Sequence, residues 1–215
     1  DAGAVVLLDA SRIEFATDPS TGEPVVLQSS KRRILILTAE GAKRYARQSL
    51  TLLSSFDTLL EFRVRVIKRD GSELTLERED AEIVGEWIDL YTDNDIYELR
   101  PRGLVPGSVL EIESSVRRSD TTFFGGGHTF SNTDPTINSE LEVVWPLGWT
   151  VETQALRDAP TSTESCDEHH CERIWRAANP PMLEWEPNAP APSALSSSVV
   201  ARLLQWQEAG TSHFE

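Results

Sequence analysis

Apolar and polar residues alternate along much of this chain, and this alternation constrains the fold more than any other feature of the sequence. The clearest run has apolar side chains at every second position and charged side chains between them: Leu60, Phe62, Val64 and Val66 alternate with Glu61, Arg63 and Arg65. Successive side chains of a β-strand point to opposite faces, so this period predicts a strand that is buried on one face only. Asp70-Gly71 follows at once and precedes a second alternating run, which predicts a tight β-hairpin.

Short segments of the same kind recur along the chain, separated by turn-forming dipeptides such as Asp18-Pro19 and Pro106-Gly107. They lie at residues 4–8, 12–16, 25–28, 33–38, 46–53, 87–91, 96–100, 109–117, 140–145, 150–156, 172–177 and 182–186. Strands at this spacing predict an all-β protein built either as an antiparallel β-sandwich or as a barrel. One helical turn is expected around residues 39–45.

The C-terminal part of the chain has a different pattern. Proline recurs in the segment 186–192, and each proline disfavours helix in the residue before it, which predicts an extended linker. After the serines at 196–198, which are favoured helix N-caps, apolar residues return at helical spacing: Val199, Val200, Leu203 and Leu204. We therefore expect a β-sandwich domain at residues 1–187. A Pro-containing linker and a short C-terminal helical tail, residues 188–215, would lead to a following domain.

Acidic side chains outnumber basic ones by 35 to 20, which gives the chain a net charge of −15 at pH 7. Phosphate backbones and anionic lipid surfaces repel such a chain, so no nucleic-acid partner is expected. Apolar runs such as residues 4–8 are far shorter than a membrane span, so no membrane insertion is expected either. The chain begins at Asp1 without a signal sequence, from which we expect a leader removed or a chain cut from a longer one.

The two cysteines, Cys166 and Cys171, lie close together and enclose His169 and His170. A disulfide is one alternative: it would close a hairpin between the strands expected at 150–156 and 172–177, and would indicate an oxidising compartment. Free thiols are a second alternative. A zinc site of two thiols and two imidazoles is a third, although adjacent histidines in so short a loop are hard to direct at one ion. A catalytic cysteine is disfavoured, because the base of a thiol protease meets the thiol across the fold.

Two further candidate sites have a simpler structural interpretation beside the functional one. The glycine run between Phe123 and His128 has no lysine after it, so we expect a loop or bulge instead of a phosphate-binding loop. The carboxylates of Asp89, Asp93 and Asp95 lack the glycine and the distant glutamate of a calcium loop, so a solvated turn is expected. The sequence thus predicts no catalytic residue, no cofactor and no metal ligand.

Tryptophan offers a further functional interpretation, because exposed indole rings can form a stacking platform for carbohydrate. The chain has six: Trp87, Trp145, Trp149, Trp175, Trp185 and Trp206. Trp145 and Trp175 fall within alternating strand patterns, however, where packing in the core is the simpler explanation.

Five motifs follow one another along the chain: the segment 34–45, the segment 64–72 with Asp70-Gly71-Ser72, the segment 104–112 with Pro106-Gly107-Ser108, the segment 134–137 followed by Trp145-Pro146, and the segment 175–180 followed by Glu184 and Pro187. In this order and spacing they resemble a bacterial family of unknown function that lies N-terminal to transglutaminase-like cores. The resemblance implies an immunoglobulin-like β-sandwich, followed in the same polypeptide by a papain-like core with a Cys-His-Asp triad. No position of this sequence matches the triad, so the resemblance implies no catalytic residue here.

The function implied by the resemblance is that of a non-catalytic accessory module of a larger bacterial protein, located in the periplasm or outside the cell. Such a module would position the downstream transglutaminase-like domain or bind a protein or peptidoglycan partner. A carbohydrate-binding module that uses surface tryptophans is the alternative.

Overall fold

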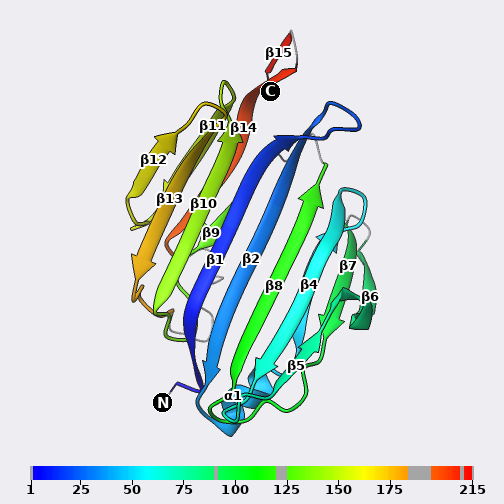
Figure 1. Ribbon diagram of the computed structural model, residues 1–215, viewed down its shortest axis with the longest axis vertical. Helices are drawn as coiled ribbons and strands as arrows, with labels where there is room; N and C mark the ends of the chain where they lie inside the picture. The colour runs from blue at the N-terminus through cyan, green and yellow to red at the C-terminus, as the bar shows by residue number, and fades with distance from the viewer. Residues whose placement is uncertain (1, 90–91, 120–124, 184–194, 209–210, 215) are drawn as a thin grey trace.

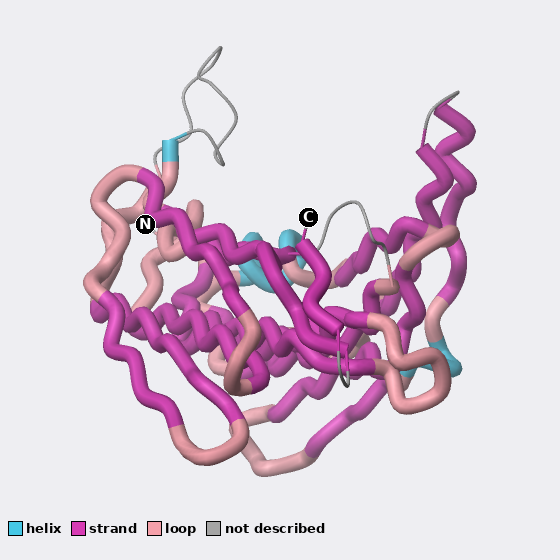
Figure 2. Tube along the Cα trace, turned by 90° about the horizontal axis from the view of Figure 1, so that it is seen from above, coloured by secondary structure: helices cyan, strands magenta, loops and turns pink. Residues whose placement is uncertain are grey.

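The computed structural model describes residues 2–89, 92–119, 125–183, 195–208 and 211–214, with the backbone alone described at 85–89, 92–93, 207–208 and 211–214. Strands make up most of this trace, and helix is confined to short segments (Figure 2). No helix among these residues is long or apolar enough to span a membrane. The prediction of an all-β sandwich is confirmed.

A large sheet of eight strands faces the viewer in Figure 1. Its strands follow one another in the order β12 (Ser162–Cys166), β13 (His170–Ala178), β10 (Asn138–Pro146), β1 (Ala4–Thr17), β2 (Pro24–Ile36), β8 (Val109–Arg118), β4 (Asp57–Ile67) and β5 (Glu73–Leu76). Neighbouring strands are antiparallel except β1 and β10, which run parallel. The sequence did not predict this parallel pair.

Two smaller sheets lie behind the large one in Figure 1 and form the second layer of the sandwich. One contains β11 (Thr150–Leu156), β14 (Ser198–Glu208) and β15 (Thr211–Phe214), with β9 (Gly125–Thr129) on the other side of β14. The other contains β3 (Gln48–Leu53), β7 (Thr92–Leu99) and β6 (Glu82–Asp89). This sheet order does not confirm the immunoglobulin-like arrangement that the resemblance implied.

The core consists of two apolar clusters, one under each smaller sheet. Under the three-stranded sheet, side chains such as Ile34, Phe62 and Leu99 pack together. Under the sheet around β14, the cluster includes Trp145 and Val199. The inner face of the large sheet is therefore apolar towards both ends, and the two smaller sheets each bury one end.

A polar belt crosses the inner face of the large sheet between the two clusters. Strand register places six side chains in it: Asp9 and Ser11 on β1, Ser30 and Arg32 on β2, Ser114 on β8, and Ser139 on β10. The hydroxyls of Ser30 and Ser114 lie 2.8 Å apart across β2 and β8. The belt interrupts the apolar pattern of β1 and β2, which explains why the sequence predicted two short segments where each of these strands is continuous.

Two local elements form as the sequence predicts. The helical turn expected at 39–45 is helix α1 (Ala39–Arg44), whose N-cap Thr38 accepts a hydrogen bond at its Oγ1 from the Gly41 N–H over 3.0 Å. The hairpin predicted at Asp70-Gly71 joins β4 to β5, and Gly71 has a φ of 82°, which a residue with a side chain rarely adopts. A short 3-10 helix, η1 (Arg78–Asp80), follows β5.

The faces of β4 are as predicted except at one residue. Phe62, Val64 and Val66 are buried, but Leu60 is 48% exposed. A bulge between Leu59 and Glu61 inserts an extra residue, so that Leu59 takes the core position instead. The assignment of Leu60 to the buried face is therefore wrong.

The predicted C-terminal helical tail is wrong. Residues 198–208 form β14, which is hydrogen-bonded to β11 on one side and to β9 on the other. Val199, Ala201 and Leu203 alternate into the core and are almost completely buried. These residues belong to the sandwich. The segment 186–192, where the linker is expected, lies outside the described residues. The strand expected at 182–186 is not formed at 182–183, and its remainder also lies outside them.

Candidate functional site

Neither smaller sheet covers the outer face of the large sheet (Figure 1). Charged side chains form stripes along the strands on this face. Along each strand the outward charged side chains mostly share one sign. Neighbouring strands carry opposite signs except β1 and β2, which both present basic side chains. We call this the striped face; it comprises Glu140 and Glu142 on β10, Arg12 on β1, Lys31 and Arg33 on β2, Glu111 and Glu113 on β8, Arg63 and Arg65 on β4, and Glu73 on β5. Opposite charges facing each other across neighbouring strands stabilise one pairing register.

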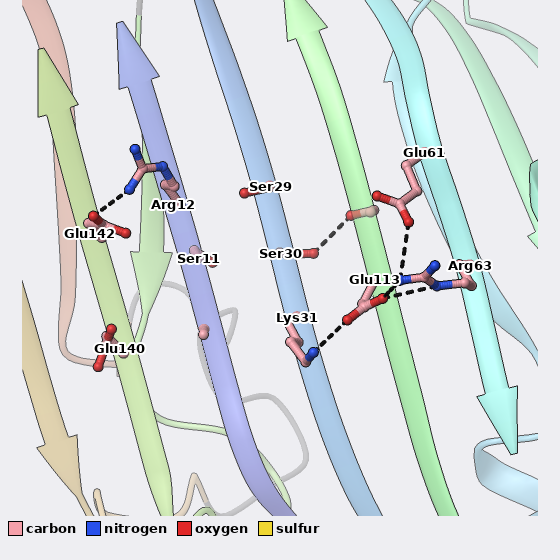
Figure 3. A pocket seen from close by; sticks show the side chains of 12 residues that line it. Ser11, Arg12, Ser29, Ser30, Lys31, Glu61, Arg63, Glu113, Glu140 and Glu142 are labelled. Atoms are coloured by element: carbon pink, nitrogen blue, oxygen red, sulfur yellow. Dashed lines mark hydrogen bonds and ion pairs between the residues drawn. The ribbon is translucent and has the colours of Figure 1, made fainter. Parts of the chain in front are cut away.

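Glu113 is the centre of one rung of this pattern (Figure 3). The Lys31 ammonium lies 2.6 Å from its Oε1, and the Arg63 Nε donates to its Oε2 over 3.0 Å. These hydrogen bonds hold the pKa of Glu113 below its ordinary value against the opposing effect of burial. One carboxylate thereby ties β2, β8 and β4 together.

Glu111 forms the neighbouring rung in the same way. Its side chain is 4% exposed and accepts hydrogen bonds from the Nε of Arg33 over 2.7 Å and of Arg65 over 2.9 Å. Burial by itself raises the pKa of this carboxyl, but the two guanidinium groups outweigh it, so the pKa lies below its ordinary value. The carboxylate is therefore ionised and held in place at neutral pH.

Small side chains beside the Glu113 rung leave a shallow hollow of about 320 Å³ on the striped face (Figure 3). Ala10 and Ser29 lie on its floor, and the ion pair of Arg12 with Glu142 stands at one side. A second hollow, of about 350 Å³, lies along β4 and β5. Because each rung engages one carboxylate with two cationic side chains, both carboxylates are already held, and the geometry suits a rigid surface better than proton transfer.

His128 on β9 is buried over the polar belt between two serines. Its Nδ1 lies 2.9 Å from Ser11 Oγ, and its Nε2 lies 2.8 Å from Ser139 Oγ. Burial lowers the pKa of His128, the charge of Asp9 opposes this shift, and that of Arg32 adds to it. A serine beside a histidine is also found in nucleophilic catalysis, where a carboxylate orients the second ring nitrogen. Here a second serine occupies that place, which satisfies a buried imidazole.

Asp134 is a second buried polar group that connects distant segments. Its carboxylate accepts hydrogen bonds from Arg44 Nη2 over 2.5 Å and from the Tyr45 hydroxyl over 2.6 Å. Burial, followed by this hydrogen bond and the negative charge, raises the pKa of Tyr45 to about 12. The end of α1 is thereby fixed to the segment that leads into β10.

Cys166 and Cys171 are joined by a disulfide, so the free-thiol and zinc alternatives do not hold. Among the described residues, no group of three or more potential ligands is placed to bind a metal. The two cysteines face each other at the turn of the β12–β13 hairpin. The sequence paired the wrong strands, because 150–156 is β11 of the other layer and the segment before Cys166 was not recognised as a strand.

The glycine run is a strand and not a loop. Residues 125–129 form β9, which lies along β14, while Phe123 and Phe124 lie outside the described residues. A Cβ at Gly125 would lie 2.2 Å from the Ala201 carbonyl oxygen, and a Cβ at Gly126 would lie 2.9 Å from Ile13 Cδ1. The glycines therefore allow close approach of two strands, which is a structural role.

The described tryptophans do not form an exposed platform. Trp145, Trp149 and Trp175 are buried in the cluster under β14, as the simpler explanation predicted for two of them. Trp206 packs partly buried against the same cluster. The side chains of Trp87 and Trp185 lie outside the described part of the chain.

Of the three carboxylates considered for calcium, only Asp95 has a described side chain, while those of Asp89 and Asp93 lie outside the described residues. Asp95 is on β7 and lines a hollow between the three-stranded sheet and the start of β4. It therefore lies within a strand, although a solvated turn was expected.

Sequence reasoning missed the two rungs, His128 and Asp134. The rungs had a visible signal, because charges of one sign recur at every second position in 31–33, 63–65 and 111–113. Which of these charged residues pair with one another depends on the order of the strands in the sheet. The alternation along a single strand does not predict that order. For His128 and Asp134 the sequence offered no comparable signal.

Comparison of sequences and folds places the chain among known proteins. The fold resembles that of a protein named "putative protease" from Parabacteroides distasonis, with a TM-score of 0.76 at 14% identity over 93% of this chain and 40% of that chain. An M1 zinc metallopeptidase from Deinococcus radiodurans also matches, with a TM-score of 0.45 at 13% identity over 99% of this chain and 46% of that one. This chain thus spans less than half the length of either protein.

No curated protein matches the sequence. Residues 28–184, well over half of the chain, match a family described as a domain of unknown function with a solved structure. The match covers four of the five motifs completely and all but the beginning and end of the sandwich. The chain belongs to this family, DUF3857.

Proposed function

We propose that this chain is a non-catalytic accessory module of a larger, exported bacterial protein. Its role is to position a transglutaminase-like catalytic domain of the same polypeptide, or to bind a protein or cell-wall partner on that domain's behalf. No reaction step is assigned to its own side chains.

The observation that carries this proposal is the unequal coverage of the shared fold. The likeness to the Parabacteroides distasonis protein extends over 93% of this chain but only 40% of that one, so the same fold occurs there beside a larger remainder. A domain that recurs as the minor part of a longer polypeptide is typical of a module that serves another domain.

The polar groups of the sandwich support the same role. The Glu111 and Glu113 rungs are held by mutual ion pairs, and both ring nitrogens of His128 are engaged by serines. Side chains fixed in this way give a rigid surface, which a docking module needs. They are poorly suited to the proton transfers of hydrolysis or acyl transfer, which require a base free to accept a proton.

Location outside the cytoplasm is part of the proposal. The Cys166–Cys171 disulfide is consistent with an oxidising compartment such as the periplasm or the extracellular space. Mass spectrometry of the protein isolated from each compartment of its native host tests this point. The oxidised chain, lighter by two hydrogens than the dithiol, is expected in the exported fraction.

The test of function compares this chain with the complete product of the gene that encodes it. Both are assayed for peptide hydrolysis on a mixture of quenched fluorescent peptides and for acyl transfer of a labelled amine to casein. Activity is expected in the complete product alone. Hydrolysis or transfer by this chain alone, or a gene whose product ends at residue 215, would overturn the proposal.

A further inference from the structure

A hollow of about 510 Å³ opens on the side of the large sheet opposite to the striped face. It lies between the beginning of β4, the turn before it, η1 and the three-stranded sheet, with Leu52 and Leu59 among its apolar lining. Its volume falls within the range of small-molecule sites in proteins. Its place in the fold separates it from both rungs of the striped face and from the polar belt.

Two polar groups at this hollow have no partner among the described residues. The Oγ of Ser54 is buried without a hydrogen-bond partner, and the half-buried Asp95 forms no hydrogen bond or ion pair with the described residues. A buried hydroxyl such as that of Ser54 is normally satisfied, so its lack of a partner calls for a physical explanation, while the Asp95 carboxylate is open to solvent or to a ligand. A ligand that donates hydrogen bonds is one such explanation.

The other charged groups of the hollow are already engaged. The Asp57 carboxylate accepts from Arg118 Nε over 2.7 Å and from the Leu53 N–H over 3.0 Å. Arg78 donates through Nη1 to the Leu59 carbonyl oxygen over 2.6 Å, which fixes the guanidinium at the rim. Glu79 is 77% exposed and its Oε1 lies 3.8 Å from Arg78 Nε, so Asp95 is the anionic group left for a ligand inside the hollow.

The surroundings of Asp95 define the chemistry of that ligand. Tyr97 lies two residues further along β7 and lines the same hollow, so a carboxylate and an aromatic ring face it together. A carboxylate binds an ammonium group by charge-assisted hydrogen bonds, an aromatic face attracts a cation, and Leu52 and Leu59 suit an alkyl chain. The negative charge of Asp95 and the net charge of −15 of the chain both disfavour an anion.

We infer that this hollow binds the terminal ammonium of a short alkyl chain, with Asp95 as the charged partner and Tyr97 beside it. A free alkylamine and the lysine side chain of a peptide share this chemistry. The inference is independent of the proposed accessory role, because it concerns a different face of the sandwich and requires no second domain.

The experiment is a titration of the isotopically labelled chain, followed by amide chemical shifts, with butylammonium chloride, 1-butanol or sodium butyrate. Saturable shifts are expected at residues 52–59 and 95–97 with butylammonium alone. Asp95→Asn should weaken butylammonium binding about tenfold, the range of one charge-assisted hydrogen bond. Tyr97→Leu should weaken it about threefold, since one exposed cation–π contact is lost.

Glu140→Gln is the matched control, because it removes a carboxylate from the striped face on the other side of the sheet. It should leave butylammonium affinity unchanged, and unaltered spectra elsewhere show that each variant is folded. Cadaverine and acetyl-lysine-amide, titrated separately, distinguish a free diamine from a lysine side chain as the tighter ligand.

Four outcomes would overturn the inference. The first is the absence of saturable shifts around the hollow with butylammonium. The second is an equal response to 1-butanol, which would indicate an apolar cavity alone. The third is an affinity that Asp95→Asn does not change or that Glu140→Gln reduces equally, and the fourth is a response to calcium chloride in place of the amine.

Discussion

A single buried imidazole makes the stability of this sandwich depend on pH. Burial lowers the pKa of His128, so the unfolded chain binds its proton more tightly than the folded protein does. His128 therefore causes no loss of stability above about pH 6.5, the ordinary pKa of histidine. As the pH falls below that value, the free energy of unfolding decreases. Urea unfolding at pH 7.5 and 5.5 should show this loss, with a slope of at most about 1.4 kcal/mol per pH unit.

His128→Gln separates this contribution from those of other groups. Glutamine retains hydrogen-bonding capacity towards Ser11 and Ser139 but does not titrate, so the variant should lose most of the decrease between pH 7.5 and 5.5. His169→Gln, on the exposed hairpin turn, should retain it. If His128→Gln and the unmodified chain lose equal stability over this range, another group is responsible.

The bulge in β4 decides which of two neighbouring apolar residues supports the core. Phe62 is 2% exposed and Leu60 is 48% exposed. Phe62→Ala should therefore lower the unfolding free energy by about 3–5 kcal/mol, through lost burial and a cavity. Leu60→Ala should change it by about 0.5 kcal/mol or less, as exposed sites usually do. Equal losses in denaturant unfolding would place the bulge elsewhere on the strand.

The contact between β9 and β14 depends on the absence of side chains from β9. A methyl group at Gly125 would meet the backbone oxygen of Ala201, which cannot rotate away, whereas at Gly127 the nearest atom, the Val199 oxygen, would be 3.0 Å away. Gly125→Ala should cost about 1–3 kcal/mol, as overpacking does. The melting temperature should fall by about 2–4 °C for each kcal/mol, and less for Gly127→Ala. The reverse order would mean that β9 shifts freely along its neighbour.

At the scale of the whole molecule, the sequence predicted the class of the fold and its local turns but not the pairing of its strands. Alternation of apolar and polar residues indicates a strand with one buried face, and Asp70-Gly71 indicates a hairpin. Both features could be predicted because each depends on only a few consecutive residues. The β1–β10 pair joins segments more than a hundred residues apart, as Ile13 beside Val143 illustrates. No local period contains that information, and the striped face depends on such pairings.

The error at the C-terminus has a different physical cause. The apolar side chains in this segment are spaced as on one face of a helix: Val199, Val200, Leu203 and Leu204. Val199 and Leu203 are also four positions apart, an even number, which places them on the same face of a strand. Both patterns therefore fit the same segment. Hydrogen bonds to β11 and β9 decide in favour of the strand, which is a tertiary effect on an ambiguous sequence.

The position of β14 makes the sandwich dependent on residues beyond the proline-containing segment. β14 is hydrogen-bonded to each of the other three strands of its sheet. Its Val199, Ala201 and Leu203 side chains are 0%, 3% and 2% exposed. Burying an aliphatic side chain such as valine or leucine contributes about 1.5–3 kcal/mol, and whole domains are stable by only about 5–15 kcal/mol. A chain ending at residue 187 should therefore melt at a lower temperature than one ending at residue 208 and should bind the dye ANS through the uncovered apolar cluster. Equal melting temperatures, without dye binding, would mean that residues 1–187 form an independent domain after all.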